Sequence, residues 1–161
     1  MSLFWWIAMG LLLVIVAAVA VAWRPIRLLF RGRRTQRAQL DFRLRREWLE
    51  ADFFHRAARS GKPRDLRWVE CEFENDVYYA RHRRSGELCA FVAVTVAFEA
   101  VEDGLMEDVE AVSDLRAATA IFHYRGGRWT AGGRVMFNLD PRSAIEFYQN
   151  ELEMVAPQPI A

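Results

Sequence analysis

The chain of 161 residues lacks the short motifs that usually announce a reaction. It contains no GxxxxGKS loop, GxGxxG turn, GxSxG elbow, HExxH helix or Ser/His/Asp set, so phosphate, dinucleotide, hydrolase and zinc-protease chemistry lose support. Its 2 cysteines are too few for the disulfide framework of a small secreted domain. The sequence therefore predicts no catalytic residue, no metal site and no cofactor, and it favours a protein that is not an enzyme.

Charge is missing from the beginning of the chain. From Leu3 to Trp23, 21 consecutive residues carry none. A helix of that length covers the roughly 30 Å of a bilayer's hydrocarbon core. Trp5 and Trp6 near one end, and Trp23 at the other, are of the residue type that prefers the headgroup level. Residues 1–24 are therefore predicted to form a transmembrane anchor.

A cleaved secretory signal is the alternative reading of this segment. Ala20-Val21-Ala22 has the small-residue form that a signal peptidase accepts. The first six residues, however, include no Lys or Arg, and the apolar run exceeds the usual core of a signal peptide. These two features favour an anchor that stays attached.

Acidic residues are missing from residues 1–40, which hold six arginines. Subtracting these from the 22 basic residues leaves 16 against 21 acidic ones, so residues 41–161 carry a net charge of about −5. Positively charged flanks stay on the cytoplasmic side, which predicts an inner-membrane protein with its N-terminus outside and its C-terminal domain in the cytoplasm. Besides the three tryptophans, the predicted membrane interface includes Arg24, Arg27, Arg31, Arg33 and Arg34.

The Arg-rich juxtamembrane segment, residues 25–37, has a second predicted role, which is to bind anionic lipid. Arginines near a bilayer surface attract anionic lipid headgroups at about 1 kcal/mol each. Nucleic acid is a poor partner because the acidic remainder of the chain repels phosphate.

Residues 38–61 are predicted to form an amphipathic helix at the start of a cytoplasmic domain that spans 38–155. Pro25 and Gly32 predict a kink between this helix and the anchor. The helix is expected to pack on the following sheet or on a second copy of the chain. Its apolar positions are Leu40, Leu44, Trp48, Ala51, Phe54 and Ala58, widened by Phe42, Leu49, Phe53 and Ala57.

The hydrophobic period changes to two over residues 66–139, which predicts an antiparallel sheet of about five strands. The third expected strand is apolar on both faces, so it should lie centrally and be covered on both sides. The expected strands are 66–73, 77–84, 87–98, 115–125 and 128–139.

Two glycine-containing turns set the predicted register. A Ser85-Gly86 turn places Tyr79 opposite Val92 and His82 opposite Cys89. Inside the last strand, Gly132-Gly133 predicts a bulge or a close backbone approach. A Gly126-Gly127 turn pairs Tyr124 with Trp129, Phe122 with Ala131 and Ala118 with Val135.

A closing helix is predicted over residues 140–155, with Asp140 as N-cap and Pro141 at the first helical position. Residues 156–161 form a tail. The whole order predicts an α+β protein: a transmembrane helix, an amphipathic helix, an antiparallel sheet of about five strands and a C-terminal helix, with the helices of the domain on one face of the sheet.

An acidic stretch follows the central strand, with no base between Arg84 and Arg116. Its simplest role is a solvated loop that keeps a sheet edge from pairing. It could instead hold a cation or dock a basic partner, although the spacing does not match an EF-hand loop. The residues expected at such a dock are Glu102, Asp103, Leu105, Met106, Glu107 and Asp108.

Two small groups of side chains could carry chemistry in the domain. The predicted strands hold Cys71 and Cys89 about 9.6 Å apart, too far for a disulfide, so both are expected to be free thiols. A pairing of Cys89 with His82 would form a dyad or a soft metal site, but a buried thiol beside a polar position is the preferred interpretation. The predicted pocket residues are Tyr78, Asp114, His123 and Tyr124.

These features favour a single-pass membrane protein whose small cytoplasmic α+β domain is a non-enzymatic interaction or accessory subunit of a membrane complex. Its expected partners are a bilayer with anionic headgroups and a protein partner or a second copy of the chain. The alternative is a membrane-tethered, cup-shaped domain that binds or transforms a small ligand. A filled core with an exposed apolar patch would favour docking, and a closed pocket with converging polar groups would favour the cup.

Overall fold

The computed structural model describes residues 2–60, 66–100 and 115–156, with the backbone alone for residues 2–4, 20–31 and 60. The chain divides into two compact units, residues 1–39 and 40–161, which are described separately below.

The first unit is helical throughout its described residues. Helix α1 runs over Ser2–Leu44, so its last residues belong to the second unit. Six consecutive apolar side chains, Leu11 to Val16, are each more than half exposed, and six residues pass all the way around a helix. In the part of the chain that the structure describes, no helix proves long and apolar enough to cross a membrane.

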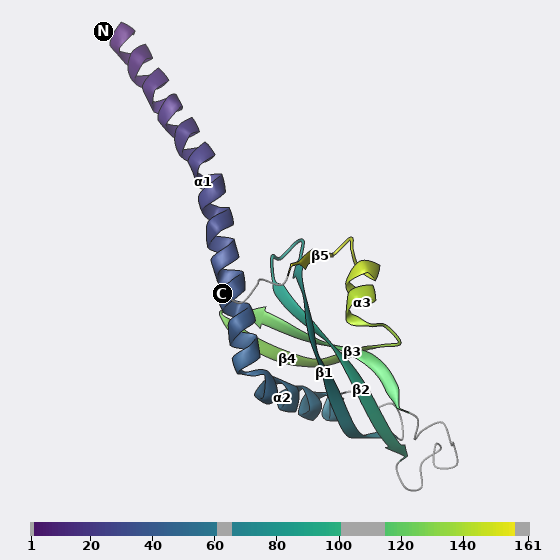
Figure 1. Cartoon of the computed structure of the whole chain (residues 1–161). Coiled ribbons are helices and arrows are strands. Elements are labelled where there is room, and N and C mark those ends of the chain that lie inside the picture. The colour runs from purple at the N-terminus through teal and green to yellow at the C-terminus, as the bar shows by residue number, and fades with distance from the viewer. Residues whose placement is uncertain (1, 61–65, 101–114, 157–161) are drawn as a thin grey trace. The chain divides into compact units, whose positions relative to one another are not determined.

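Helix α1 is continuous through the region where a kink was expected, and its axis bends along its length (Figure 1). Pro25 and Gly32 both lie within α1, and the break falls at Arg45, before helix α2 (Arg46–Ser60). The backbone N–H of Arg45 still donates to the carbonyls of Asp41 and Phe42, at 3.1 and 3.2 Å. The predicted helix over 38–61 is therefore two helices that meet in a tight turn.

The second unit contains a curled antiparallel sheet of five strands (Figure 1). This confirms the α+β class and the strand number. The order across the sheet is β4-β3-β2-β1-β5, with β2 in the middle. The strands are β1 (Leu66–His82), β2 (Leu88–Ala100), β3 (Arg116–Arg125), β4 (Arg128–Phe137) and β5 (Leu152–Val155).

The make-up of the sheet differs from the prediction at its first strand. The two strands expected over 66–73 and 77–84 are one strand, β1, which runs through both and ends at His82. The register passes from Phe73 opposite Val94 to Val77 opposite Val92, so three residues of β1 face one of β2. Such a bulge absorbs extra residues and bends the strand without ending it. Arg46 of α2 donates hydrogen bonds to the carbonyls of Glu74 and Asn75 within the bulge.

The turn between β1 and β2 is longer than expected. The backbone N–H of Gly86 donates to the carbonyl of His82 at 2.8 Å, and Arg83 to Gly86 form the loop. Tyr79 therefore lies opposite Ala90 and not Val92, and Ala80, not His82, lies opposite Cys89. The shift is by two residues, which leaves each side chain on its predicted face.

The second hairpin begins as predicted and then shifts. Tyr124 pairs with Trp129 and Phe122 with Ala131, which confirms the Gly126-Gly127 turn. Beyond Phe122 the register slips, and Ala118 faces Phe137 where Val135 was expected. The predicted bulge at Gly132-Gly133 causes this slip, because it adds residues to β4 alone.

The closing helix begins as predicted but ends early. Asp140 caps α3 (Pro141–Phe147) by accepting from the backbone N–H groups of Arg142 and Ser143, both at 3.0 Å. Residues after Tyr148 turn back and form β5, which pairs with β1 from Tyr79 to His82. The predicted helix over 140–155 was wrong in its second half because those backbone groups complete the edge of the sheet.

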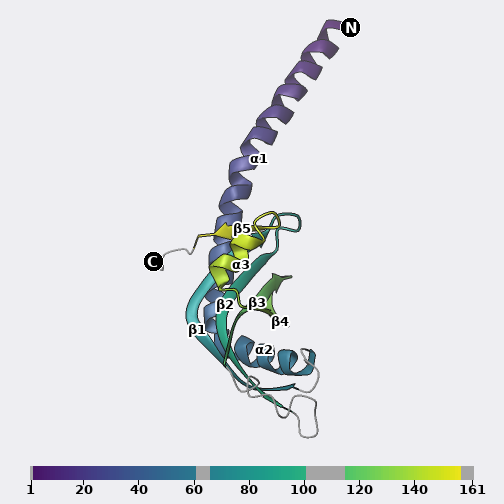
Figure 2. The ribbon, with the colours of Figure 1, turned by 90° about the vertical axis from the view of Figure 1, so that its right-hand side faces the viewer.

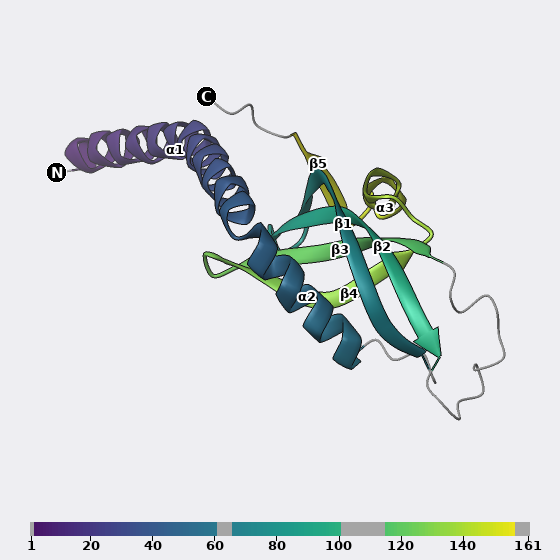
Figure 3. The ribbon, with the colours of Figure 1, turned by 60° about the horizontal axis from the view of Figure 1, so that its bottom comes forward.

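Helices cover both faces of the sheet, not one (Figures 2 and 3). On the first face, Phe42, Leu49, Phe53 and Ala57 are fully buried. The ring of Phe42 packs against those of Phe122 and Trp129, with centroids 5.2 and 4.9 Å away. On the second face, Ala144 and Ile145 of α3 pack over Ala80, Cys89 and Phe91. The prediction that the central strand is covered on both sides is thus confirmed.

The buried stripe of the α1–α2 region was assigned to the wrong positions. Leu40, Leu44 and Trp48, expected to pack on the sheet, are 53%, 85% and 63% exposed. The positions expected only to widen the stripe supply the core instead. Phe42 and Leu49 are seven residues apart, and Phe53 and Ala57 follow Leu49 at intervals of four, so the buried positions form a helical stripe of their own.

Gly133 yields a prediction on stability. It has φ +66°, and a Cβ there would stand 2.9 Å from the backbone of Arg56 and Ala57 in α2. Gly133→Ala should therefore lower the free energy of unfolding by about 2 kcal/mol or more. Denaturant unfolding of the full chain measures the loss.

The neighbouring Gly132 provides the matched control. A Cβ at Gly132 meets only the ring of His123, at 3.8 Å, which is ordinary contact. Gly132→Ala should change the stability far less, and an equal loss in both variants would contradict the close packing of α2 on Gly133.

Candidate functional site

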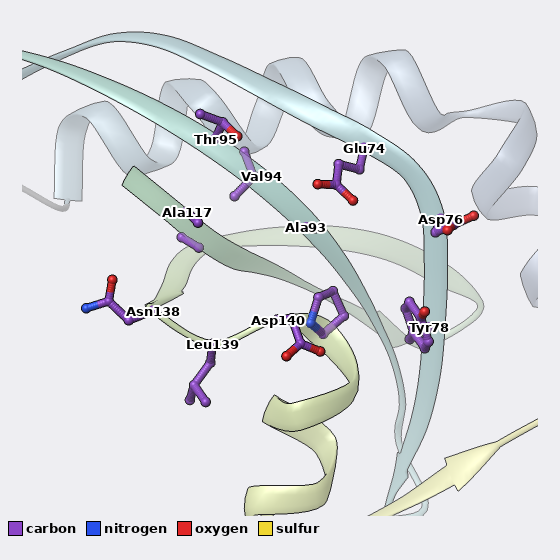
Figure 4. Close-up of a pocket in the computed structure, with 12 residues that line it drawn as sticks. Glu74, Asp76, Tyr78, Ala93, Val94, Thr95, Ala117, Asn138, Leu139 and Asp140 are labelled. Atoms are coloured by element: carbon purple, nitrogen blue, oxygen red, sulfur yellow. The ribbon is translucent and has the colours of Figure 1, made fainter. Parts of the chain in front are cut away.

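A cavity of about 410 Å³ lies on the α3 side of the sheet (Figure 4). The bulge of β1 contributes Glu74 and Asp76 to its wall, and Tyr78 follows on the same strand. The connection from β4 to α3 forms the opposite wall. The remaining lining residues are Ala93, Val94 and Thr95 of β2, Ala117 and Ala118 of β3, and Asn138, Leu139, Asp140 and Pro141.

A turn at Asn138 and a hydrogen bond from Thr119 fix the position of the connection between β4 and α3. Asn138 has φ +58°, a left-handed conformation that lets the chain turn out of β4. Fully buried Thr119 donates from Oγ1 to the carbonyl of Leu139 at 2.6 Å. The Thr119 side chain is therefore covered by this connection and not solvated.

The cavity is acidic. Its lining includes Glu74, Asp76 and Asp140 and no basic residue. Hydrogen bonds from Ser143 hold the pKa of Asp140 below its usual value of 3.8, so this carboxylate stays charged while it caps α3. Such a lining suits a small cationic ligand better than an anionic one.

A second group of polar side chains lies where β2 begins. Glu87 and Cys89 are two residues apart and share a face, and Cys89 pairs across the ladder with His123 of β3. The Nδ1 of His123 lies 2.8 Å from Oε1 of Glu87 and 3.5 Å from Sγ of Cys89. Arg125 Nε donates to the same Glu87 oxygen at 2.8 Å. We call these four residues the Glu87 cluster.

The electrostatics of the Glu87 cluster keep the carboxylate charged and the thiol neutral. Burial raises the pKa of Glu87, but hydrogen bonds from Arg125 and His123 outweigh it and hold the pKa below 4.5. Burial and the charge of Glu87 raise the pKa of Cys89 to about 12. Cys89 is therefore a thiol at neutral pH and not the thiolate that a nucleophile requires.

The Cys89–His82 dyad considered from the sequence is wrong. Because the turn is longer than expected, Cys89 faces Ala80 on one side and His123 on the other. Spacing along the chain gave no signal that Cys89 would lie beside His123, since β2 and β3 are separated by residues 101–115. Both cysteines are free, as predicted.

The predicted pocket residues do not come together. Tyr78 lines the cavity, and His123 belongs to the Glu87 cluster. Tyr124 follows His123 along β3 and therefore lies on the other face, where its ring is 5.1 Å from that of Trp129. Asp114 lies outside the described residues.

The residues proposed for membrane and partner contacts fall in two groups. Trp5, Trp6, Arg33 and Arg34 are exposed on α1. The acidic segment proposed as a dock, residues 102–108, lies outside the described residues. The other members of the predicted membrane interface lie where α1 is described by its backbone alone; they are Trp23, Arg24, Arg27 and Arg31.

Comparisons of this chain with protein family models, curated proteins and solved structures give no match. The function must therefore be argued from the residues and geometry described above.

The Glu87 cluster predicts a pH-dependent contribution to stability. A carboxyl group whose pKa is lowered by folding stabilises the fold fully above its unfolded pKa, and this stabilisation is lost as the pH falls through the folded value. Glu87→Gln should therefore cost about 1–2 kcal/mol at neutral pH, and the difference from the native chain should shrink below about pH 4.5. Denaturant unfolding at a series of pH values measures it.

Exposed Glu146 is a suitable control, because it pairs with Arg142 at 3.0 Å on the surface of α3. Glu146→Gln should cost less than about 0.5 kcal/mol at neutral pH. A constant difference for Glu87→Gln across the whole pH series would contradict the assignment.

Proposed function

We propose that this protein is a single-pass membrane protein whose α+β domain serves as a non-enzymatic interaction or accessory subunit of a membrane complex. The proposal joins two arguments, one for the anchor and one for the domain. The filled core of the domain, together with an apolar patch left exposed beside it, is the observation that carries the assignment to docking.

The anchor is supported by the sequence of the first 24 residues and by the exposure of side chains along α1. The uncharged run from Leu3 to Trp23 has the length of a membrane-spanning helix. Between Trp5 and Val19 the large apolar side chains are 48% to 72% exposed. Exposed apolar surface on all sides of a helix is unfavourable in water and favourable in lipid.

The orientation is supported by the arginines that follow the run. Arg33 and Arg34 are exposed, and no acidic residue precedes Asp41. This arrangement favours a cytoplasmic location for the domain, against anionic headgroups of the inner membrane.

The role of the domain is supported by how its interior is filled. On this face of the sheet, the ring of Phe122 packs against those of Phe42 at the end of α1 and Phe53 of α2, with centroids 5.2 and 5.5 Å away. A core packed in this way leaves no room for a ligand among these rings. Leu40, Leu44 and Trp48, which we call the elbow patch, are exposed at the same junction. An exposed apolar cluster of this kind is typical of a protein contact.

A second candidate function rests on the acidic cavity. Its volume of about 410 Å³ falls within the range of small-molecule sites. The corresponding role is a membrane-tethered domain that binds a small cationic ligand or transforms it. The Glu87 cluster lies on the same face of the sheet, but its protonated thiol supports binding rather than catalysis.

The anchor can be tested by adding charge to the apolar run. Leu12→Arg combined with Val16→Arg should release the protein from the membrane, because an arginine at the centre of a bilayer costs about 2.5–3.5 kcal/mol. The measurement is the fraction of protein that stays with the membrane pellet after alkaline carbonate extraction. Gln36→Arg, which adds an arginine at an exposed position further along α1, should have no effect.

Two outcomes would contradict the anchor and its orientation. A native chain that is fully extracted by carbonate, or one whose mature form begins at Trp23, does not span the membrane. Loss of the C-terminal domain when intact spheroplasts are treated with protease would place the domain on the outer side.

The docking role predicts an assembly that depends on the elbow patch. The native chain, extracted in mild detergent, should have a mass above that of one chain. Leu44→Glu should weaken this assembly about tenfold or more, because burying a leucine contributes about 1.5–3 kcal/mol. Native mass spectrometry or light scattering measures the mass.

Leu115 supplies the matched control, since it is 69% exposed but lies outside the elbow patch. Leu115→Glu should leave the assembly unchanged. A native chain that runs as a lone monomer would overturn the docking role, and equal weakening by both variants would overturn the assignment to the elbow patch.

A further inference from the structure

The Glu87 cluster has the arrangement of a metal site. The spacing of its residues along the sequence does not predict such a site, and the proposed docking role does not use it. Its Glu, Cys and His each offer one ligand atom, and the three atoms lie within 4.8 Å of one another. The strand geometry explains this convergence. Residues two apart on one strand share a face with their neighbour across the ladder, whose Cβ lies about 4.5–5.5 Å away.

The distances can be compared with those of a bound ion. Zinc lies about 2.3 Å from a thiolate sulfur and about 2.0–2.1 Å from an imidazole nitrogen, so tetrahedral angles hold these two ligands about 3.6 Å apart. Cys89 Sγ and His123 Nδ1 already stand 3.5 Å apart. Glu87 Oε1 is 2.8 Å from Nδ1 and would have to withdraw by about 0.6 Å to reach the tetrahedral spacing of about 3.4 Å.

Solvent access to the three ligand atoms and the contact of Glu87 with Arg125 are also favourable. Cys89 is buried at 4% exposure, whereas the side chains of His123 and Glu87 are 29% and 15% exposed. An ion can therefore enter from solvent on the histidine side, and water can complete the coordination. Arg125 is an exposed partner of Glu87, so it can follow the carboxylate when Oε1 turns to the metal.

We propose that Glu87, Cys89 and His123 bind a single zinc-like divalent ion, with the thiolate sulfur, Nδ1 and one carboxylate oxygen as ligands. Binding replaces the thiol proton of Cys89, which goes to solvent. His123 gives up the Nδ1 hydrogen that it donates to Glu87 and carries its one hydrogen on Nε2 instead, so that the Nδ1 lone pair is free for the ion. The ion and its two anionic ligands then sum to zero charge. A sulfur, nitrogen and oxygen ligand set suits zinc better than magnesium or calcium, which prefer oxygen alone.

Cobalt(II) is the probe that distinguishes this site from adventitious binding, because a thiolate ligand gives Co²⁺ a charge-transfer absorption in the near ultraviolet. Full-length protein in mild detergent, stripped with a chelator, is titrated with Co²⁺ and then with Zn²⁺. The expected result is one Co²⁺ per chain with the thiolate absorption, and loss of that absorption when Zn²⁺ is added. Binding should weaken as the pH falls, because the ligands must be deprotonated.

Three variants identify the ligands. Cys89→Ser should abolish the thiolate absorption, and Glu87→Gln should weaken binding at least about tenfold. Cys71→Ser should leave the absorption intact, because Cys71 pairs with Val96 at a distant point of the sheet. Since Cys89 is buried, His123→Gln is a second test on a more exposed side chain, and circular dichroism verifies that each variant is folded.

The proposal is overturned if the native chain shows no thiolate absorption with Co²⁺. It is equally overturned if the absorption survives His123→Gln at native affinity, or if it follows Cys71 instead of Cys89. None of these outcomes bears on the docking role, which is judged by the mass of the assembly.

Discussion

Burial of both faces of β2 is the constraint on which the rest of the domain depends. From Leu88 to Phe98 this strand presents apolar side chains in both directions, and most of them are buried. A strand of this kind cannot stand at a surface, since each exposed face would leave apolar area in water at about 25 cal/mol per Å². Two further strands flank it on each side, and a helix layer covers each face. Helices α2 and α3 differ in how much of their face of the sheet they cover.

The two coverings divide the sheet into a sealed face and an open one. Helix α2 approaches β4 so closely that Gly133 has no room for a side chain, and aromatic rings fill the space beneath it. Helix α3 is only seven residues long and covers its face through Ala144 and Ile145. The uncovered remainder of that face contains both the acidic cavity and the Glu87 cluster. Among the described residues, the acidic cavity and the Glu87 cluster thus lie on the side that the shorter helix leaves open.

Features that depend on neighbouring residues were predictable from the sequence. The Gly126-Gly127 turn and the Asp140 cap are examples, because glycine at positive φ and a capping carboxylate act within a few residues. The double burial of β2 was also predictable, since it follows from composition alone. The cavity was predicted only through Tyr78, one of its lining residues.

Features that depend on the partner of a strand or helix were not predictable. The bulge at residues 74–76 looked like a loop, and only the carbonyl contacts of Arg46 and the continuity of the ladder show that β1 passes through it. Residues 152–155 carried a helical pattern, yet they pair with the free edge of β1. The meeting of Cys89 with His123 likewise required the pairing of β2 with β3, which no spacing along the chain specifies. In each case a long-range hydrogen-bonded ladder outweighed the local pattern.

The error in the amphipathic stripe has a physical consequence of its own. This segment has two sets of apolar positions, and only the set that contains Phe42, Leu49, Phe53 and Ala57 faces the sheet. Leu40, Leu44 and Trp48 are left at the surface although the core beside them is complete. Apolar side chains that the fold does not bury are available to another surface, and the proposed docking role rests on this exposure. In that proposal the side of the domain whose core is filled by aromatic rings is the side that makes the protein contact.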